Sequence, residues 1–189
     1  MDQHINKLCK ASDSSLLAID IQSRLTANMP MKVVDRLKNN SATLLTAAEI
    51  LSIPVFATLQ YPKGLGPIEP SIDKHLPDSA QFFEKTCFSC TDAEDFMQAL
   101  EQCNRKQVIL TGVEAHICVL QTAIGLLTRG YQVFVALDAV CSRQRENYEN
   151  AIQRMANANI NICNTESILF EWLRDASHEH FRAVSALIK

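Results

Sequence analysis

Four short apolar runs along the chain predict buried β-strands. They occupy residues 15–21, 53–59, 107–113 and 131–140 and are rich in valine, isoleucine and leucine. They lack the alternation of polar and apolar residues that a strand with one solvent-exposed face shows, which indicates a parallel sheet covered on both faces. Asn161 to Cys163 are a candidate for one more short strand.

Segments with helical periodicity separate these runs. Apolar residues recur at intervals of three and four within 34–51 and 96–103. Further helices fit residues 115–129, 144–158 and 165–188. Strands that alternate with amphipathic helices predict a three-layer, Rossmann-like α/β fold, in which helices flank a central parallel sheet of about six strands with right-handed crossovers.

Residues 61–91 interrupt this alternation, because they contain four of the six prolines and two of the five glycines. We predict that the segment is mostly loop, and its length suggests an active-site loop. No repeat or change in composition marks a domain boundary. We therefore expect residues 1–189 to form a single domain, with residues 1–13 as an N-terminal extension.

Composition and charge exclude several classes of protein. The 18 Lys and Arg against 21 Asp and Glu give a formal charge of −3, without a basic cluster of the kind that nucleic acids or anionic membranes require. No apolar run approaches the roughly 18 residues of a membrane span. The seven cysteines are an odd number, and the N-terminus lacks the layout of a secretory signal. These features predict a soluble cytoplasmic protein with reduced thiols.

Three residues are candidates for chemistry, and two of them follow predicted strands. In an open parallel sheet the ligand crevice lies beyond the carboxyl ends of the strands, where Asp20 and Cys118 are expected. A helix start lowers the pKa of a thiol, so Cys118 is predicted to be a nucleophile at neutral pH. Lys85 lies among aromatic residues and thiols and could hold both groups anionic. The alternatives are a structural carboxylate, an inert buried thiol and a solvated lysine.

Three sequence blocks resemble the isochorismatase-like (cysteine hydrolase) superfamily, especially its small isochorismatase-domain proteins. They are LLAIDIQ, FEKTCFSC and TGVEAHICVLQTA, in the family's order and spacing. The resemblance implies a catalytic triad of Asp20, Lys85 and Cys118. Cys118 would give its proton to Asp20 and attack a carbonyl carbon, and a water activated by Asp20 would hydrolyse the thioester. Lys85 would stabilise the charges.

The resemblance also implies a cis peptide between Val113 and Glu114, with the backbone N–H groups of Glu114 and Cys118 forming an oxyanion hole. Nicotinamidases of the superfamily carry an Asp-x-His metal pair after the second strand, where this chain has Gln60 and Tyr61. We therefore expect no metal and no cofactor. Isochorismatases proper do not depend on a nucleophilic cysteine, so Cys118 favours C–N bond hydrolysis of a small amide-like or other carbonyl substrate. Members commonly self-associate, which implies a homo-oligomer.

Several other residues have competing interpretations. Gln22, Gln60 and His116 are candidates for the substrate pocket. For the Cys87–Cys90 C-x-x-C pair, packing near Lys85 is favoured over redox or zinc chemistry. The residues expected to have structural or surface roles are Asp138 as a cap, Arg143, Arg145 and Arg154 in ion pairs, and His178 and His180 in solvent. Two alternative functions remain, a non-catalytic metabolite-binding or interaction module on this fold and a thiol redox protein.

Overall fold

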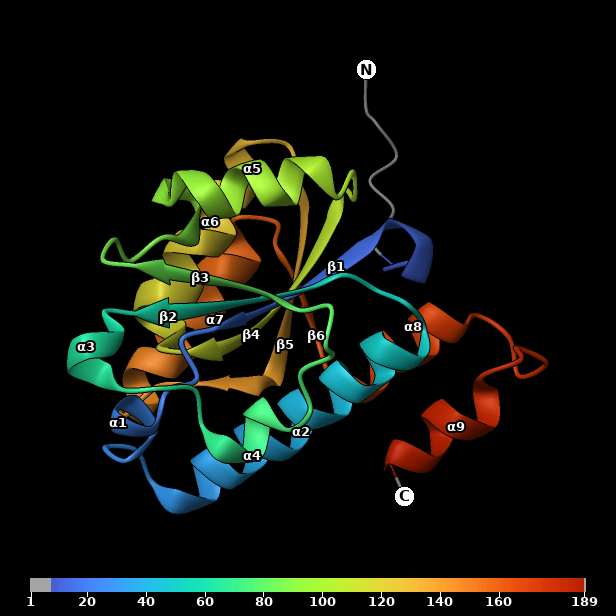
Figure 1. The fold of residues 1–189 in the computed structure, drawn as a ribbon, viewed down its shortest axis with the longest axis horizontal. Helices are drawn as coiled ribbons and strands as arrows, with labels where there is room; N and C mark the ends of the chain where they lie inside the picture. Colours follow the sequence, from blue (N-terminus) through green and yellow to red (C-terminus); the bar gives the residue numbers. More distant parts are fainter. Residues whose placement is uncertain (1–7, 189) are drawn as a thin grey trace.

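A six-stranded parallel sheet forms the centre of the protein in a computed structural model that describes residues 8–188 (Figure 1). The strands are β1 (Ser14–Ile19), β2 (Val55–Gln60), β3 (Gln81–Lys85), β4 (Gln107–Val113), β5 (Gln132–Cys141) and β6 (Asn161–Cys163). Every neighbouring pair is parallel. The predicted α/β sheet is thereby confirmed.

Helices cover both faces of the sheet and complete the three layers (Figure 1). One face packs against α2 (Met31–Ile50), α8 (Thr165–Leu173) and α9 (Phe181–Ser185), and the other against α5 (Glu94–Gln102), α6 (Leu120–Thr128) and α7 (Arg145–Asn157). The shorter elements are η1 (Ala11–Asp13), α1 (Ser23–Thr26), α3 (Pro62–Leu65), α4 (Pro70–Asp73), η2 (Cys90–Asp92), η3 (Ala115–Val119) and η4 (Ala186–Ile188). No helix within residues 8–188 is both long and apolar enough to span a membrane.

The strand order is β3-β2-β1-β4-β5-β6, so the order reverses between β1 and β4. The connections that leave these two strands run in opposite directions, which opens a crevice at their carboxyl ends. Asp20 directly follows β1, and the turn that leads to Cys118 directly follows β4. The fold therefore brings two of the three candidate residues to its switch point.

The expectation that residues 61–91 are mostly loop is wrong in part. The segment contains α3, α4 and the edge strand β3, which pairs in parallel with β2. Phe82 and Glu84 of β3 are exposed, so this strand lacks the continuous apolar run by which the other strands were predicted. Because Lys85 is the last residue of β3, a rigid strand end rather than a loop carries it to the crevice.

A single helix over residues 165–188 is also wrong, because α8 ends at Leu173 and α9 begins at Phe181. Arg174 adopts a φ of 63°, outside the helical region. The Asp175 carboxylate accepts hydrogen bonds from the Ser177 N–H at 2.7 Å and the Ser177 hydroxyl at 2.6 Å. Such local side-chain bonds compete with helical hydrogen bonds and favour a turn.

The predicted N-terminal extension lies partly outside the described residues, which begin at Leu8. Its described part is joined to the domain. The Cys9 N–H donates to Glu171 Oε2 and the Lys10 N–H donates to Gln107 Oε1, both at 2.7 Å. Residues 9 and 10 therefore bridge α8 and the start of β4.

Gly112 is required where β4 passes β1. Its φ is +130°, and a Cβ placed there would collide with the Ile19 carbonyl oxygen. We expect Gly112→Ala to lower the free energy of unfolding by at least about 3 kcal/mol. Gly130→Ala is the control, because Gly130 also has a positive φ of +83° but no atom within 4 Å of the added Cβ. It should cost only about 1 to 2 kcal/mol. Urea unfolding of both variants checks this, and equal losses would contradict it.

Candidate active site

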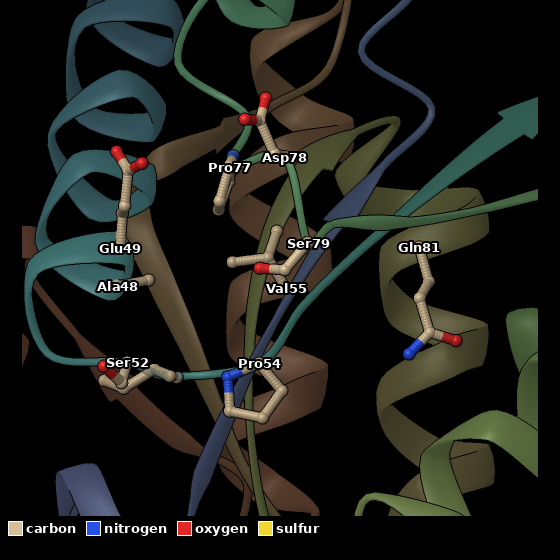
Figure 2. Close-up of a pocket in the computed structure, with 10 residues that line it drawn as sticks. Ala48, Glu49, Ser52, Pro54, Val55, Pro77, Asp78, Ser79 and Gln81 are labelled. Carbon is tan, nitrogen blue, oxygen red and sulfur yellow. The ribbon is translucent and has the colours of Figure 1, made fainter.

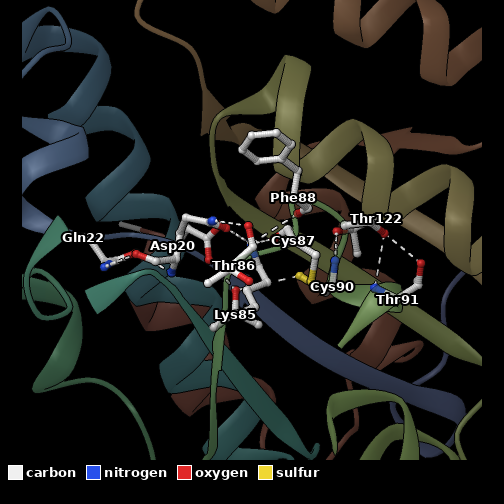
Figure 3. A network of polar contacts seen from close by, with 12 residues as sticks. Asp20, Gln22, Lys85, Thr86, Cys87, Phe88, Cys90, Thr91 and Thr122 are labelled. Atoms are coloured by element: carbon white, nitrogen blue, oxygen red, sulfur yellow. Dashed lines mark hydrogen bonds and ion pairs between the residues drawn. The ribbon is translucent and has the colours of Figure 1, made fainter. Parts of the chain in front are cut away.

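Asp20, Lys85 and Cys118 meet at the carboxyl edge of the sheet. The Lys85 ammonium lies 2.7 Å from Asp20 Oδ2, as Figure 3 shows for this pair within its polar network. The Cys118 thiol lies close enough to the same carboxylate for Asp20 to raise its pKa. The exposed fractions of the three residues are 0%, 5% and 6%, so all three groups are buried. The structure thus joins an acid, an amine and a thiol from three distant segments.

Asp20 is fixed by its neighbour on β2. The Thr58 hydroxyl donates to Asp20 Oδ1 at 2.7 Å, and the Asp20 N–H donates to the Thr58 carbonyl oxygen at 3.1 Å. Asp20 has a φ of 52°, in the left-handed region that aspartate tolerates better than most residues. Sequence reasoning did not identify Thr58, although a polar residue near the end of the apolar run 53–59 was an available indication. Thr58 holds the carboxylate in place.

Lys85 is surrounded by acceptors. Besides Asp20, its ammonium donates to Gln60 Oε1 at 2.7 Å and to the carbonyl oxygens of Cys87 and Phe88 at 3.3 and 3.2 Å (Figure 3). Burial by itself lowers the pKa of Lys85, but the Asp20 carboxylate and the nearby thiols outweigh burial and raise it above the ordinary value. Lys85 is therefore charged at neutral pH.

The expectation of a lowered thiol pKa at Cys118 is wrong for the unliganded chain. Cys118 lies in η3, a π-helical turn that leads into α6. Burial, followed by the Asp20 carboxylate, raises the pKa of the Cys118 thiol, and Lys85 lowers it by less. A helix start is visible in the sequence, whereas burial beside a carboxylate is not. Burial and the Asp20 carboxylate therefore favour a protonated thiol over a free thiolate in the resting chain.

The turn between β4 and η3 is tied to the end of β5. The peptide between Val113 and Glu114 is cis. The Glu114 carboxylate accepts a hydrogen bond from the Arg143 N–H at 3.2 Å, and its oxygens lie 3.3 Å from Arg143 Nε and 3.4 Å from His116 Nδ1. His116 Nδ1 also lies 3.0 Å from the Ser142 hydroxyl. These contacts fix the backbone that carries the predicted oxyanion donors.

The predicted pocket residues Gln22 and Gln60 bond mainly to the protein itself. Gln22 Oε1 accepts from the Gln60 N–H at 2.8 Å, and its amide group donates to the carbonyl oxygens of Gln60 and Gly66 at 3.1 and 2.7 Å. The Gln60 amide group donates to the Thr86 carbonyl oxygen at 2.8 Å. Both side chains join the segments around the crevice. Substrate contact by Gln22, Gln60 or His116 stays a prediction.

The remaining cysteines pack around the site or elsewhere in the core. Cys90 is buried, and its sulfur lies 3.8 Å from the Thr58 hydroxyl. Cys87 contributes its carbonyl oxygen to Lys85. All seven cysteines are free thiols. Within residues 8–188 there is no cluster of three or more His, Cys, Asp or Glu side chains placed to hold a metal.

The residues expected to have structural roles have the following contacts. The Asp138 carboxylate accepts hydrogen bonds at 2.9 Å from the Thr165 N–H and hydroxyl, at the first residue of α8. Arg145 Nε pairs with Glu149 at 2.7 Å. Among the described residues Arg154 has no carboxylate within 4.0 Å, so its predicted ion pair is not formed. The rings of His178 and His180 lie 5.7 Å apart, and both are partly exposed.

A cavity of about 450 Å³ lies at the opposite edge of the sheet from the triad. Its lining includes Glu49, Ser52, Pro54, Val55 and Asp78, with Pro54 and Val55 at the start of β2 (Figure 2). Parallel strands place their amino and carboxyl ends at opposite edges. This cavity is therefore separate from the crevice that holds Asp20.

The buried thiols predict a loss of stability in alkaline solution. Burial raises the pKa of Cys90 and Cys141 to about 12 and that of Cys163 to about 11, and it also raises the pKa of Cys9 and Cys118. Above pH 9.0, the ordinary thiol value, unfolded thiols lose protons that folded ones keep. The contribution of the buried thiols to the free energy of unfolding is therefore fully present below that pH and is lost as the pH rises.

We expect each fully buried thiol to contribute a slope of roughly 1.4 kcal/mol per pH unit above that value. Urea unfolding in reducing buffer at about pH 8, 9 and 10 measures the slope. Cys141→Ala should reduce the slope of the unfolding free energy against pH by the contribution of one thiol. A free energy of unfolding that stays constant over this range would contradict the prediction.

Comparisons with known proteins show the family of the chain. Residues 14–167 match the isochorismatase domain family. Isochorismatase family protein 1B of Dictyostelium discoideum is 35% identical over 181 residues, which cover 93% of this chain and 86% of that protein.

Two solved structures resemble the chain along most of its length. The MAR1 ribonuclease from Caenorhabditis elegans has a TM-score of 0.90 and 34% identity, covering 96% of this chain and 92% of the other. The YcaC gene product from Escherichia coli, described as an octameric hydrolase of unknown specificity, has a TM-score of 0.88 and 25% identity, covering 96% and 89%. The chain therefore belongs to the isochorismatase family and has the fold of its hydrolases.

Proposed function

We propose that the chain is a cysteine hydrolase that cleaves the C–N bond of a small amide-like or related carbonyl substrate through a thioester on Cys118. The observation that carries this proposal is the buried contact of one carboxylate, Asp20, with both the Lys85 ammonium and the Cys118 thiol. A base in hydrogen-bond contact with a nucleophile, itself oriented by a third group, is the arrangement that nucleophilic catalysis requires.

In the first half of the reaction, the Cys118 thiol gives its proton to Asp20 as the sulfur attacks the carbonyl carbon. The carbonyl oxygen becomes an oxyanion that accepts hydrogen bonds from the backbone N–H groups of Glu114 and Cys118. Asp20 then passes the proton to the leaving amine, the C–N bond breaks and a thioester remains. Lys85 stays charged and limits the electrostatic cost of placing two anionic groups together.

In the second half, Asp20 takes a proton from a water molecule that attacks the thioester. The second oxyanion is held by the same two N–H groups, and the carbon–sulfur bond breaks. Asp20 returns the proton to the sulfur, which releases a carboxylic acid and restores the thiol. The raised pKa of the Cys118 thiol fits this cycle, because the resting sulfur carries the proton that the leaving group needs.

Mass spectrometry of the intact protein tests the proposal. The protein is incubated with a panel of small amides, esters and carbamoyl compounds, and any adduct is located by peptide mapping. We expect an acyl adduct on Cys118 that is absent in Cys118→Ala. Alkylation rates are a weaker test, because the resting thiol is buried and protonated while Cys87 and Cys103 are partly exposed. An acyl adduct on another cysteine that is competent for turnover would contradict the assignment.

A small molecule remains our proposed substrate, and a homo-oligomer in the cytoplasm our proposed state. The related protein from C. elegans is named a ribonuclease, but a triad with exposed fractions of 0% to 6% and a chain of formal charge −3 suit a small ligand better than a polynucleotide.

The YcaC protein is an octamer. The exposed aromatic residues Tyr61, Phe82 and Phe88 lie in the segment around β3 and are candidates for an interface. Sedimentation measures the oligomeric state.

A further inference from the structure

A second cavity lies at the carboxyl edge of the sheet, on the side of β5. Its volume is about 330 Å³. Ser142 and Arg143 line it from the segment after β5, Arg36 lines it from α2, and Arg145 and Tyr148 line it from α7. Because α2 and α7 cover opposite faces of the sheet, the cavity bridges both helical layers above the strand ends. The cavity therefore lies at the same edge of the sheet as the switch-point crevice, and this is the edge at which open parallel sheets bind ligands.

The charged groups in the lining are mainly cationic. Three guanidinium groups, from Arg36, Arg143 and Arg145, line the cavity together with a single carboxylate, that of Glu149. A planar guanidinium presents several donors in a geometry that matches carboxylate and phosphate oxygens. The lining is therefore complementary to an anionic group.

Of the three arginines, Arg36 is the one best able to bind an anionic group. It has no carboxylate within 4.0 Å among residues 8–188; its guanidinium lies 3.5 Å from the Val140 carbonyl oxygen and 5.6 Å from the centre of the Tyr148 ring. Arg145, by contrast, pairs with Glu149 through Nε at 2.7 Å. Its terminal nitrogens carry further donors, because one guanidinium has five. Tyr148 donates its hydroxyl to the Leu137 carbonyl oxygen and is held in place.

Two residues that line the cavity also contact the turn between β4 and η3. Arg143, which lines it, contacts the Glu114 carboxylate, and Ser142, which also lines it, contacts His116. Val113 of the cis peptide is paired with Cys141, the residue before Ser142. A ligand group held by the arginines would therefore lie beside the turn that carries the proposed oxyanion donors.

We propose that this cavity binds an acidic group, a carboxylate or a phosphate, of the same substrate whose carbonyl carbon Cys118 attacks. The inference rests on the proposed function and narrows it, because the substrate class becomes a small amide or related carbonyl compound that also carries a negative charge. The alternative source of the same chemistry is a separate free anion such as inorganic phosphate.

Direct binding is the first test. Isothermal titration of the native chain with malonate, malonamide and inorganic phosphate should show saturable binding of the two anions and none of the neutral diamide. The double variant Arg36→Gln/Arg145→Gln should bind the anions about tenfold more weakly or worse. Arg182→Gln, at an exposed position of α9 that does not line the cavity, should match the native chain. Absence of saturable anion binding, or equal binding by the double variant once its folding is verified by circular dichroism, would overturn the inference.

A matched pair of substrates distinguishes the two sources of the anion. With an acidic substrate and its neutral analogue, the ratio of their kcat/KM values should fall about tenfold in Arg36→Gln/Arg145→Gln. An unchanged ratio with retained phosphate binding would assign the cavity to a separate anion and overturn the substrate class.

Acyl-adduct formation on Cys118 and anion binding in the cavity can be tested independently of each other. Anion binding does not involve the Cys118 sulfur, so Cys118→Ala should bind malonate as the native chain does. Anion binding without an acyl adduct on Cys118 would count against the proposed reaction, whereas an adduct without anion binding would count against this inference alone.

Discussion

Replacing Cys118 with alanine should abolish hydrolysis of every substrate that the protein accepts, with a loss in kcat of at least about 10⁴-fold. The proposed reaction passes through a bond to this sulfur, and no neighbouring group can replace it at the same place. Cys90, the other buried thiol beside Lys85, is hydrogen-bonded to the Thr58 hydroxyl, and burial raises its pKa to about 12.

The measurement is kcat under substrate saturation, and the control is Cys103→Ala. Cys103 follows α5 and has no contact with the triad in the described structure, so its loss should leave kcat within about twofold. If Cys118→Ala kept more than about 1% of the native kcat, a different nucleophile would be responsible. A loss of similar size in Cys103→Ala would indicate damage to the fold.

Removing one member of the buried pair between Asp20 and Lys85 should have the second large effect. Lys85→Met leaves the Asp20 carboxylate buried with the Thr58 hydroxyl as its remaining strong donor, and Asp20→Asn leaves a buried ammonium without its counter-charge. Breaking such a pair costs roughly 3 to 5 kcal/mol. Because the pKa of Lys85 is raised, the stability that this group contributes is present throughout neutral pH and is lost only as the pH rises through that high value.

A double-mutant cycle measures the coupling of the pair. The double variant Asp20→Asn/Lys85→Met contains neither charge, so its loss of unfolding free energy should be several kcal/mol smaller than the sum of the single losses. Urea unfolding at pH 7 gives the values. Additive losses would contradict a direct interaction. Turnover should be lost in all three variants, because Asp20 is the proposed base and Lys85 stabilises its charge.

The apolar pattern predicted most of the sheet, because β1, β2, β4 and β5 are buried on both faces and therefore consist of continuous apolar runs. It did not predict β3, an edge strand whose alternate residues Phe82 and Glu84 are exposed. It also did not predict the break after Leu173, where Asp175 bonds locally to Ser177. These two features depend on position in the sheet and on side-chain contacts, which periodicity does not report.

The sequence also predicted only part of the active site. Asp20 and Cys118 were predicted from their positions at strand ends, and Lys85 from the aromatic residues and thiols around it. The family resemblance implied that the three act together as a triad. The direction of the Cys118 pKa shift was wrong, because it depends on burial and on the distance to Asp20. The arginines after β5 were predicted only to form ion pairs. The cavity that Arg143 and Arg145 line together with Arg36 arises from three segments whose proximity the sequence does not show.

A crystal structure of the Asp20→Asn variant exposed to an activated acetyl ester would show directly whether Cys118 is the nucleophile. This variant lacks the proposed base for both halves of the reaction. Acylation should nevertheless proceed, because an activated ester needs no proton donor for its leaving group, and because loss of the Asp20 carboxylate removes a charge that raises the pKa of the Cys118 thiol while Lys85 still lowers it. Hydrolysis of the thioester has no such help, so the acyl-enzyme should accumulate. We expect electron density for an acetyl group bonded to Cys118 Sγ, with its carbonyl oxygen within hydrogen-bond distance of the N–H groups of Glu114 and Cys118. Density for an acetyl group on Cys90 or another residue, with Cys118 unmodified, would contradict it.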